Sequence, residues 1–520
     1  MKNTSTRIIP AIEIDKQTAI IRRIREALQN LPSQPLAYID TYGCQQNESD
    51  SEKLRGMLAE MGYDTTGDEY SADVVVINTC AIRENAENRV LGNVGELIHT
   101  KKVKPSQIIV FCGCLAGVPK TVEKINESYR QVDLVFAPNK LWRFPELLST
   151  VMENKGMVPS AERGPSAERG PSAIEQSLWK ELSMWPADRV PHNSRSGSSF
   201  RPFAFPHIDA GHDDGAIAEG LPIKRDGRIK AWLPIMYGCN NFCSYCIVPY
   251  VRGRERSRAP EDVLFEAKAL VADGYKDITL LGQNVNSYGG NIDFATLIRK
   301  INEIEGEFLI RFMTSHPKDA SIDLFRAMAE SEKAAKHIHL PFQAGNDRIL
   351  KLMNRGYTQE IYLEKVAAAR DLMPGIVITS DVIVGFPGET EAEFEDTLRL
   401  VEKAQFDAMF TFIYSKRPGT PAAAQTDATS REEKQVRFDR LLELQNAISE
   451  KKHKHHAGST MRVLVDEKSH DERYPLKART NGGRLVHLRG DPGILGHFID
   501  ARITHCNSWS LFGESICPIQ

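Results

Sequence analysis

Three cysteines within one short stretch constrain this chain more than any other feature of its sequence. Cys239, Cys243 and Cys246 follow the spacing C-x3-C-x2-C. A structural zinc site needs four protein ligands, usually in two separated pairs, and no second pair of Cys or His follows at that distance. A 4Fe-4S cluster has four irons, so three cysteines leave one iron open to a small molecule. These three residues, the loop cysteines, therefore predict a 4Fe-4S cluster with one open iron.

The loop cysteines resemble the signature of the radical S-adenosylmethionine (SAM) enzymes, with Tyr245 in its aromatic position. The resemblance implies that the amine and carboxylate of SAM bind the open iron, and that reductive cleavage of SAM releases a 5′-deoxyadenosyl radical. In such a site the cofactor carries the difficult chemistry and the protein positions it. The alternative, a set of buried structural cysteines, is disfavoured by the close spacing.

Length and composition describe an ordinary globular protein with room for two or three domains in 520 residues. The sequence has neither an apolar run long enough to cross a bilayer nor the apolar core of a signal peptide, so we expect a cytoplasmic protein with no membrane contact. Nine cysteines in a reducing compartment favour ligands over disulfides. The net charge of −3 means that any nucleic-acid surface must be a local basic patch.

Residues 35–151 alternate strand and helix patterns, which predicts a parallel α/β sheet. The expected strands cover 36–42, 74–79, 108–111 and 134–136, and the expected helices cover 50–61 and 84–99. Cys44, Cys80 and Cys114 follow the first three strands. Ligands of open parallel sheets gather beyond the carboxyl ends of the strands, so we expect these three residues, the sheet cysteines, to meet in one crevice. Three unrelated buried thiols are the alternative, because the sheet cysteines are distant in sequence.

Cys112 lies only two residues before Cys114. We expect its side chain to point to the opposite side of the chain from Cys114, into the core. We assign it to packing and Cys114 to the ligand set.

Three motifs around the sheet cysteines, at 41–47, 78–86 and 113–116, resemble the N-terminal domain of the methylthiotransferase family. The resemblance implies that Cys44, Cys80 and Cys114 hold a second 4Fe-4S cluster with one iron free of protein ligands. Gln46 stands where Met is common in that family, a departure that touches no ligand.

Two segments fall outside this pattern. Residues 1–34 are predicted to be a leader with one amphipathic helix over 11–31. Residues 152–228 contain a PSAERG repeat at 159–164 and 165–170, and are predicted to be a linker or insertion whose later aromatic residues pack on a domain surface. His192, His207 and His212 are irregularly spaced and favour scattered surface histidines over a metal site.

Residues 229–450 resume the alternation of strands and helices. The expected strands cover 231–236, 278–281, 309–312, 338–340, 377–384 and 409–414. Six such strands predict a partial (β/α)6 barrel, in which the loop cysteines follow the first strand at the carboxyl-terminal rim.

Glycine-rich loops follow three of these strands, at 282–289, 341–346 and 385–389. Glycine lets the backbone approach a ligand closely, and amide side chains offer both donors and acceptors. These loops resemble the cofactor-contacting loops of radical SAM enzymes. The predicted SAM contacts are Gln283, Asn284, Gln343, Ser380 and Asp381, of which the last two lie within a strand and have a structural role as their alternative.

Four arginines lie within seven residues just after the loop cysteines: Arg252, Arg254, Arg256 and Arg258. A run of charge is usually a solvated face. Arginine also binds phosphate bidentately and stacks on bases, and beside a radical site we favour that role. We predict that these four residues contact the substrate RNA.

Residues 451–520 carry 11 Lys and Arg against 7 Asp and Glu, with short strand patterns at 461–465, 485–488 and 498–503. Gly-rich turns between such strands predict a small β-barrel. The motifs at 479–482 and 511–514 resemble the TRAM domain, an OB-like RNA-binding module. Cys506 and Cys517 have no local partner and are expected to be structural.

The order of these parts resembles the methylthiotransferase family over all but residues 1–34 and 152–228, and the motifs at 78–86, 250–258 and 314–317 are closest to its MiaB type. That type adds a methylthio group to C2 of N6-isopentenyladenosine at position 37 of tRNA, beside the anticodon. C2 of adenine bears an unactivated C–H bond that no acid or base removes at neutral pH, so a radical step is required.

The resemblance also implies the cofactors and partners. Two SAM molecules would be used per turnover, one to methylate a sulfur on the sheet-cysteine cluster and one to make the radical at the loop-cysteine cluster. We expect a monomer that takes electrons from a flavodoxin or ferredoxin and binds the anticodon stem-loop.

Three other functions remain open. The chain could act on a threonylcarbamoyl-type tRNA adenosine or on an aspartate of a ribosomal protein, although the arginine run and local motifs favour tRNA. A non-enzymatic iron–sulfur RNA-binding protein would need no SAM. The sequence does not identify the sulfur donor.

Overall fold

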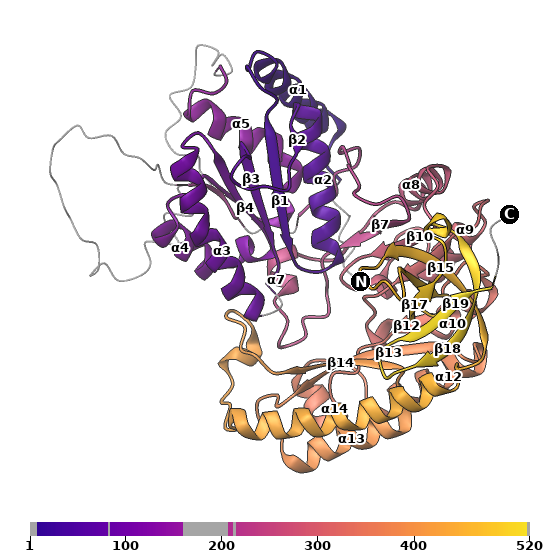
Figure 1. The fold of residues 1–520 in the computed structure, drawn as a ribbon. Coiled ribbons are helices and arrows are strands. Elements are labelled where there is room, and N and C mark those ends of the chain that lie inside the picture. Colours follow the sequence, from indigo (N-terminus) through magenta and orange to yellow (C-terminus); the bar gives the residue numbers. More distant parts are fainter. Residues whose placement is uncertain (1–7, 82–83, 160–205, 212–214, 517–520) are drawn as a thin grey trace.

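The computed structural model describes residues 8–81, 84–159, 206–211 and 215–516. Figure 1 shows an N-terminal α/β domain, a curved central α/β domain and a C-terminal β-barrel that lies against the central domain. The second copy of the PSAERG repeat, the aromatic residues expected to pack on a surface, His192, His212 and Cys517 lie outside the described residues. Among the helices of the described ranges, none combines the length and apolar character needed to cross a bilayer.

The N-terminal domain contains a six-stranded sheet in the order β2-β1-β3-β4-β5-β6, and all of its strand pairs are parallel. Its strands are β1 (Leu36–Tyr42), β2 (Asp64–Thr65), β3 (Val74–Thr79), β4 (Ile108–Gly113), β5 (Leu134–Phe136) and β6 (His207–Asp209). The four predicted strands are all present. β6 comes from the segment predicted to be a linker, so part of that segment completes the sheet.

Helices cover both faces of this sheet because its buried strands are apolar on both sides. They are α1 (Ala11–Leu28), α2 (Gln45–Met61), α3 (Glu84–Val103), α4 (Pro119–Ser128) and α5 (Phe144–Asn154). One core contains Val74 and Val76 with residues of α1, α2 and α5. The other contains Val75 and Ile77 with residues of α3 and α4.

Helix α1 corresponds to the helix predicted in the leader. Its residues Ile21, Ile24 and Leu28 are buried in the same core as Met57 of α2 and Leu147 of α5. The amphipathic pattern is therefore satisfied by packing on the N-terminal domain, and this helix is not separate from it.

The central domain has two three-stranded parallel sheets, in the orders β11-β10-β7 and β12-β13-β14. Its six strands are β7 (Lys230–Pro234), β10 (Asp277–Leu281), β11 (Leu309–Phe312), β12 (His337–His339), β13 (Val377–Val384) and β14 (Ala408–Ile413). A parallel bridge between Ile310 and Ala334 joins the two sheets beside β11 and β12. Because β7 and β14 end the two sheets, the barrel is partial, as predicted.

The helices of the central domain pack around this partial barrel. They are α8 (Pro260–Ala272), α9 (Phe294–Asn302), α10 (Ile322–Glu330), α11 (Asp347–Leu352), α12 (Gln359–Leu372), α13 (Glu391–Ala404) and α14 (Arg431–Lys454). One continuous core includes the fully buried rings of Phe342, Tyr362 and Phe406. The loop cysteines follow β7, where the chain forms a short β8 (Met236–Tyr237), α7 (Val248–Arg252) and β9 (Arg256–Ser257).

The C-terminal domain is a closed barrel in the order β15-β16-β17-β19-β18. Its strands are β15 (Thr460–Lys468), β16 (Leu476–Thr480), β17 (Leu485–Arg489), β18 (Phe498–Cys506) and β19 (Leu511–Ser515). The side chain of Arg311 in β11 donates to the carbonyl oxygens of Thr480 and Asn481. These hydrogen bonds fix a turn of the barrel on the central domain.

Candidate active site

The sheet register brings the sheet cysteines together. Tyr42, Thr79 and Gly113 are neighbours across β1, β3 and β4. Cys44 lies two residues after Tyr42, Cys80 follows Thr79, and Cys114 follows Gly113. Since parallel strands end at the same edge, all three cysteines lie at one edge of the sheet. The common edge agrees with the predicted convergence, and the ligand role of the three cysteines remains a prediction.

The pKa values of these thiols depend on close neighbours. A hydrogen bond with Cys80 lowers the pKa of Cys44 to about 6, with a further contribution from the positive charge of Arg252. Burial raises the pKa of Cys114, although Arg252 opposes that rise. The thiolate is the form that ligates iron, so the surroundings of Cys44 favour a ligand.

Cys112 lies on the other side of β4. It belongs to the core that contains Ile108 and Val110, whereas Cys114 belongs to the core on the opposite face. The two side chains lie on opposite faces, as predicted. Residues two apart in a regular strand share a face, so the reversal comes from Gly113, whose φ is +91°, and from the 3-10 helix that begins at Cys114. The ligand role of Cys114 remains a prediction.

The loop cysteines lie on the central domain where β7 gives way to its rim loop. The backbone N–H of Cys246 donates to the carbonyl oxygen of Cys243, which closes a tight turn between them. Burial raises the pKa of Cys239 to about 11 and that of Cys246 to about 12, and in both cases the neighbouring Cys243 adds to the rise. A bound metal deprotonates such thiols outright, so these raised values belong to the metal-free site.

Two further side chains contact Cys243. The buried Arg355 donates from Nη1 to its Sγ atom over 3.2 Å and from Nη2 to the carbonyl oxygen of Pro341 over 2.8 Å. Nε2 of His316 lies 3.9 Å from the same sulfur. Nδ1 of His316 accepts the N–H of Lys318, so in the neutral ring the proton is on Nε2 and faces the sulfur. Burial, with help from Arg355, lowers the pKa of His316 to about 2.

The predicted SAM contacts separate into two groups. Gln283 accepts the N–H of Gly238 beside Cys239, so it holds the cysteine loop. The backbone N–H of Gln343 donates to the carbonyl oxygen of Asp381 over 2.9 Å, which brings these two rim residues together. For Gln283, Gln343 and Asp381 the role in SAM binding remains a prediction.

The other two residues, Asn284 and Ser380, form hydrogen bonds within the protein. Asn284 is buried, donates to Ser287 and Asp319, and accepts the backbone N–H of His316. The Ser380 hydroxyl is buried and bonds the backbone of Leu340 and Phe342. Both residues therefore have structural partners, and their contact with SAM remains a prediction.

Three of the four arginines predicted to contact RNA have partners within the protein, and their contact with RNA remains a prediction. Arg252, Arg256 and Arg258 are buried. Arg258 forms ion pairs with Glu219 and Glu266, and Arg256 donates to the carbonyl oxygens of Arg252 and Arg254. Their guanidinium groups are held by partners of the same chain, and two of them, those of Arg252 and Arg256, line the pocket described below. Only Arg254 of the four is exposed, and it lies over the ring of Phe242.

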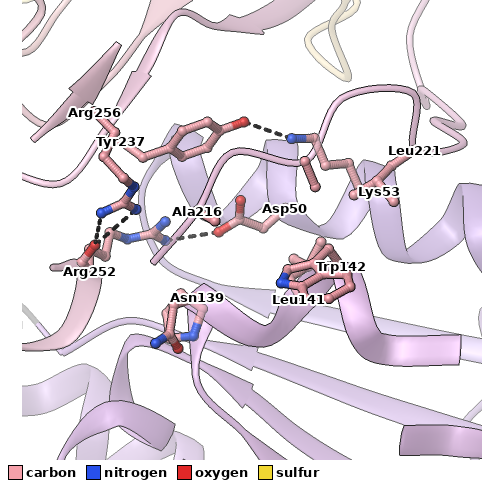
Figure 2. A pocket seen from close by; sticks show the side chains of 12 residues that line it. Asp50, Lys53, Asn139, Leu141, Trp142, Ala216, Leu221, Tyr237, Arg252 and Arg256 are labelled. Carbon is pink, nitrogen blue, oxygen red and sulfur yellow. Dashed lines mark hydrogen bonds and ion pairs between the residues drawn. The ribbon is translucent and has the colours of Figure 1, made fainter. Parts of the chain in front are cut away.

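Arg252 lies on the boundary between the first two domains. Its Nε atom lies 3.2 Å from Sγ of Cys114, and its Nη2 atom lies 2.9 Å from a carboxylate oxygen of Asp50. Figure 2 shows this ion pair beside an open pocket whose walls come from both domains. Across the same boundary, Lys53 of α2 donates to the hydroxyl of Tyr237.

Comparison with known proteins identifies the three parts. Residues 36–137 match "Uncharacterized protein family UPF0004", residues 233–401 the radical SAM superfamily and residues 454–516 the TRAM domain. A tRNA-2-methylthio-N(6)-dimethylallyladenosine synthase from Acetivibrio thermocellus is 45% identical over 92% of this chain and 90% of its own length. A synthase of the same name from a Thermoanaerobacter species is 44% identical over 97% of both chains. The chain belongs to this synthase family.

A solved structure agrees with the synthase fold. The radical S-adenosylmethionine methyltransferase TsrM from Kitasatospora setae superposes with a TM-score of 0.50 over 75% of each chain at 16% identity. At that identity the likeness shows the fold alone.

The cysteines of this synthase fit iron–sulfur clusters better than single ions. In the described ranges, no three His, Cys, Asp or Glu side chains surround one metal ion. A 4Fe-4S cluster spreads its protein ligands over separate irons, so its cysteines need not converge on one point. Cys112, the thiol nearest to the sheet cysteines in sequence, faces away from them. Membership of the radical SAM superfamily implies a 4Fe-4S cluster and SAM.

Sequence reasoning missed two residues of this site. Arg355 had no local motif to mark it, because its partners are Cys243, Pro341 and a buried tyrosine. His316 lies in the motif at 314–317 that carried the family resemblance, and that motif was the available signal.

Proposed function

We propose that this chain is a radical SAM methylthiotransferase that adds a methylthio group to C2 of N6-dimethylallyladenosine, also called N6-isopentenyladenosine, in tRNA. One observation carries the proposal. The chain has two separate cysteine trios, on neighbouring domains, in a family whose curated members are named for this product. Two trios suit a reaction that both inserts sulfur and breaks a C–H bond.

The loop cysteines hold the radical-generating cluster in this proposal. When bound, a 4Fe-4S cluster with SAM supplies a radical able to remove an unactivated hydrogen. Gln283 keeps the cysteine loop against the rim through its bond to Gly238. Gln343 and Asp381 lie together at the same rim and contact SAM. Arg355 and His316 donate toward Cys243 and orient it.

The sheet cysteines would hold the second cluster, to which the sulfur that is transferred would be attached. Cys44 is the N-cap residue just before α2, and Cys114 is the first residue of a short 3-10 helix (Cys114–Gly117). Backbone N–H groups and the positive end of a helix favour the negative charge of a bound thiolate. With Arg252 also close, these surroundings favour thiolate ligands. A one-electron donor of the flavodoxin or ferredoxin class and a monomeric state complete the proposal.

The C-terminal barrel supplies an RNA surface in this proposal. His487, Phe512 and His505 are cross-strand neighbours on β17, β19 and β18. Their rings stack, with centroids 4.9 Å apart for the first pair and 4.4 Å for the second. Arg489 lies 5.0 Å from the ring of the adjoining Tyr474. Aromatic rings beside arginine are how proteins hold unpaired bases without reading sequence.

The test of this function is mass spectrometry of tRNA nucleosides from cells with and without the gene. The expected result is loss of the 2-methylthio derivative and accumulation of N6-dimethylallyladenosine. An unchanged tRNA with an altered ribosomal-protein aspartate would support the protein-directed alternative. A threonylcarbamoyl nucleoside that loses its methylthio group would support the other tRNA alternative.

A further inference from the structure

Arg252 belongs to the central domain, yet its side chain ends among the sheet cysteines of the N-terminal domain. It is six residues from Cys246 in sequence and 3.2 Å from the sulfur of Cys114 in space. We propose that Arg252 is a positioning residue that sets the reduction potential of the cluster held by the sheet cysteines. This inference rests on the proposed function, because it requires the second cluster.

The guanidinium group is enclosed by groups of the other domain. Arg252 is 6% exposed. Asp50, whose carboxylate accepts a hydrogen bond from Nη2 of Arg252, is also 6% exposed. Asp50 lies on α2, the helix that begins next to Cys44. Arg252 therefore bridges the elements that present two of the three sheet cysteines.

The segment that carries Arg252 is fixed before any cluster binds. Ile247 and Val251 are buried in the same core as Cys114 and Leu115. The carbonyl oxygen of Arg252 accepts two hydrogen bonds from Arg256, drawn in Figure 2. Because backbone and side chain are both held, the N–H group of Arg252 is preorganised toward the sulfur.

The electrostatic effect has a definite sign. Reduction adds negative charge to an iron–sulfur cluster and its thiolates. An N–H donor and a fixed positive charge next to a ligand sulfur stabilise that reduced form, which raises the potential. Arginine stays charged at every accessible pH, so the effect is permanent. Asp50 offsets part of the positive charge.

The chain offers a matched control. Arg258 is buried to a similar extent and pairs with Glu219 and Glu266, but it contacts none of the sheet cysteines in the contacts of the described residues. Replacing it disturbs a buried arginine in the same loop without removing an N–H group from a ligand sulfur.

The experiment uses the full chain with Cys239, Cys243 and Cys246 changed to Ala, so that only the sheet-cysteine cluster is reconstituted, with about four irons per chain. Its potential is measured by redox titration followed by electron paramagnetic resonance. Arg252→Gln is expected to shift the potential to a more negative value, Arg252→Lys to shift it less, and Arg258→Lys to leave it unchanged. An unchanged potential in Arg252→Gln, with iron retained, overturns the proposal.

A second variant covers the case in which Arg252→Gln fails to hold iron. Asp50→Asn removes the offsetting negative charge and keeps the arginine at the sulfur, so the potential is expected to rise. No rise, or a fall, overturns the proposal. Failure of the parent triple variant to bind any cluster would instead contradict the two-cluster function, which separates the two outcomes.

Discussion

The two cysteine trios have similar surroundings, but the residues that surround them come from different parts of the chain. Each has one sulfur that accepts a hydrogen bond of 3.2 Å from a buried arginine, Arg355 at Cys243 and Arg252 at Cys114. The loop cysteines and their arginine all belong to the central domain. The sheet cysteines come from three strand ends, and their arginine comes from the neighbouring domain. The first site is self-contained, whereas the second depends on how two domains pack.

The largest expected effect separates the two sites by function. Changing all three loop cysteines to Ala should halve the iron of the reconstituted protein and abolish cleavage of SAM to 5′-deoxyadenosine under dithionite. Changing all three sheet cysteines to Ala should also halve the iron but leave tRNA-free cleavage in place. Iron analysis and product chromatography measure both. Cleavage that survives loss of the loop cysteines would refute the assignment of the radical site.

The next effect tests whether Cys114, and not Cys112, is the ligand at the second site. Cys114→Ala should lose the sheet-cysteine cluster, while Cys112→Ala should keep full iron and destabilise the fold by about 1 kcal/mol, as expected for a small buried deletion. Iron content and thermal unfolding are the measurements. Loss of iron from Cys112→Ala alone would show that the wrong member of the pair was chosen.

A smaller effect tests whether Arg355 supports the loop cysteines as Arg252 is proposed to support the sheet cysteines. Arg355→Gln should lower the rate of SAM cleavage by about 10- to 100-fold, the usual cost of removing a group that orients a metal ligand. Arg348→Gln, which removes an exposed arginine paired with Glu393, is the control and should have no effect. If both variants cleave SAM at the parental rate, Arg355 does not act on the radical site.

The smallest effect concerns tRNA, whose affinity should reside outside both cysteine sites. Phe512→Ala on the C-terminal barrel should weaken tRNA binding by about 1–3 kcal/mol without changing its salt dependence, because stacking involves no counterion release. Arg254→Ala should lower the salt slope by about one unit. Fluorescence anisotropy over a salt series measures both. Phe265→Ala on α8, an exposed ring away from the barrel, is the control. Equal binding by both ring variants would rule out the barrel surface.

The sequence predicted those parts of the structure that depend on local patterns. The four predicted strands of the N-terminal sheet and the six predicted strands of the central domain lie where apolar runs marked them. The loop cysteines are close in sequence, so the sequence was enough to group them. β6 was missed because it has only three residues and follows a repeat segment, which gave no strand period to detect. Its pairing with β5 is a tertiary contact.

The partners of the charged and polar side chains could not be predicted from the sequence. A run of four arginines has the same letters whether it faces water or is buried, and only the partners decide. Asp50, Glu219 and Glu266 pair with two of these arginines. Two of the three carboxylates are distant in sequence, so no local pattern announces the pairing. Asn284 illustrates the same limit, because its partner Asp319 comes from another rim loop.

The position of β6 bears on how the length of the chain that precedes it can vary. α5 ends at Asn154 and β6 begins at His207, and both belong to one domain, so the intervening stretch starts and finishes on the same body. The entropy of closing a loop grows only with the logarithm of its length, and even a doubling costs about 0.6 kcal/mol. A change in the number of residues between α5 and β6 would therefore cost little free energy and leave the spacing of the two cysteine trios untouched.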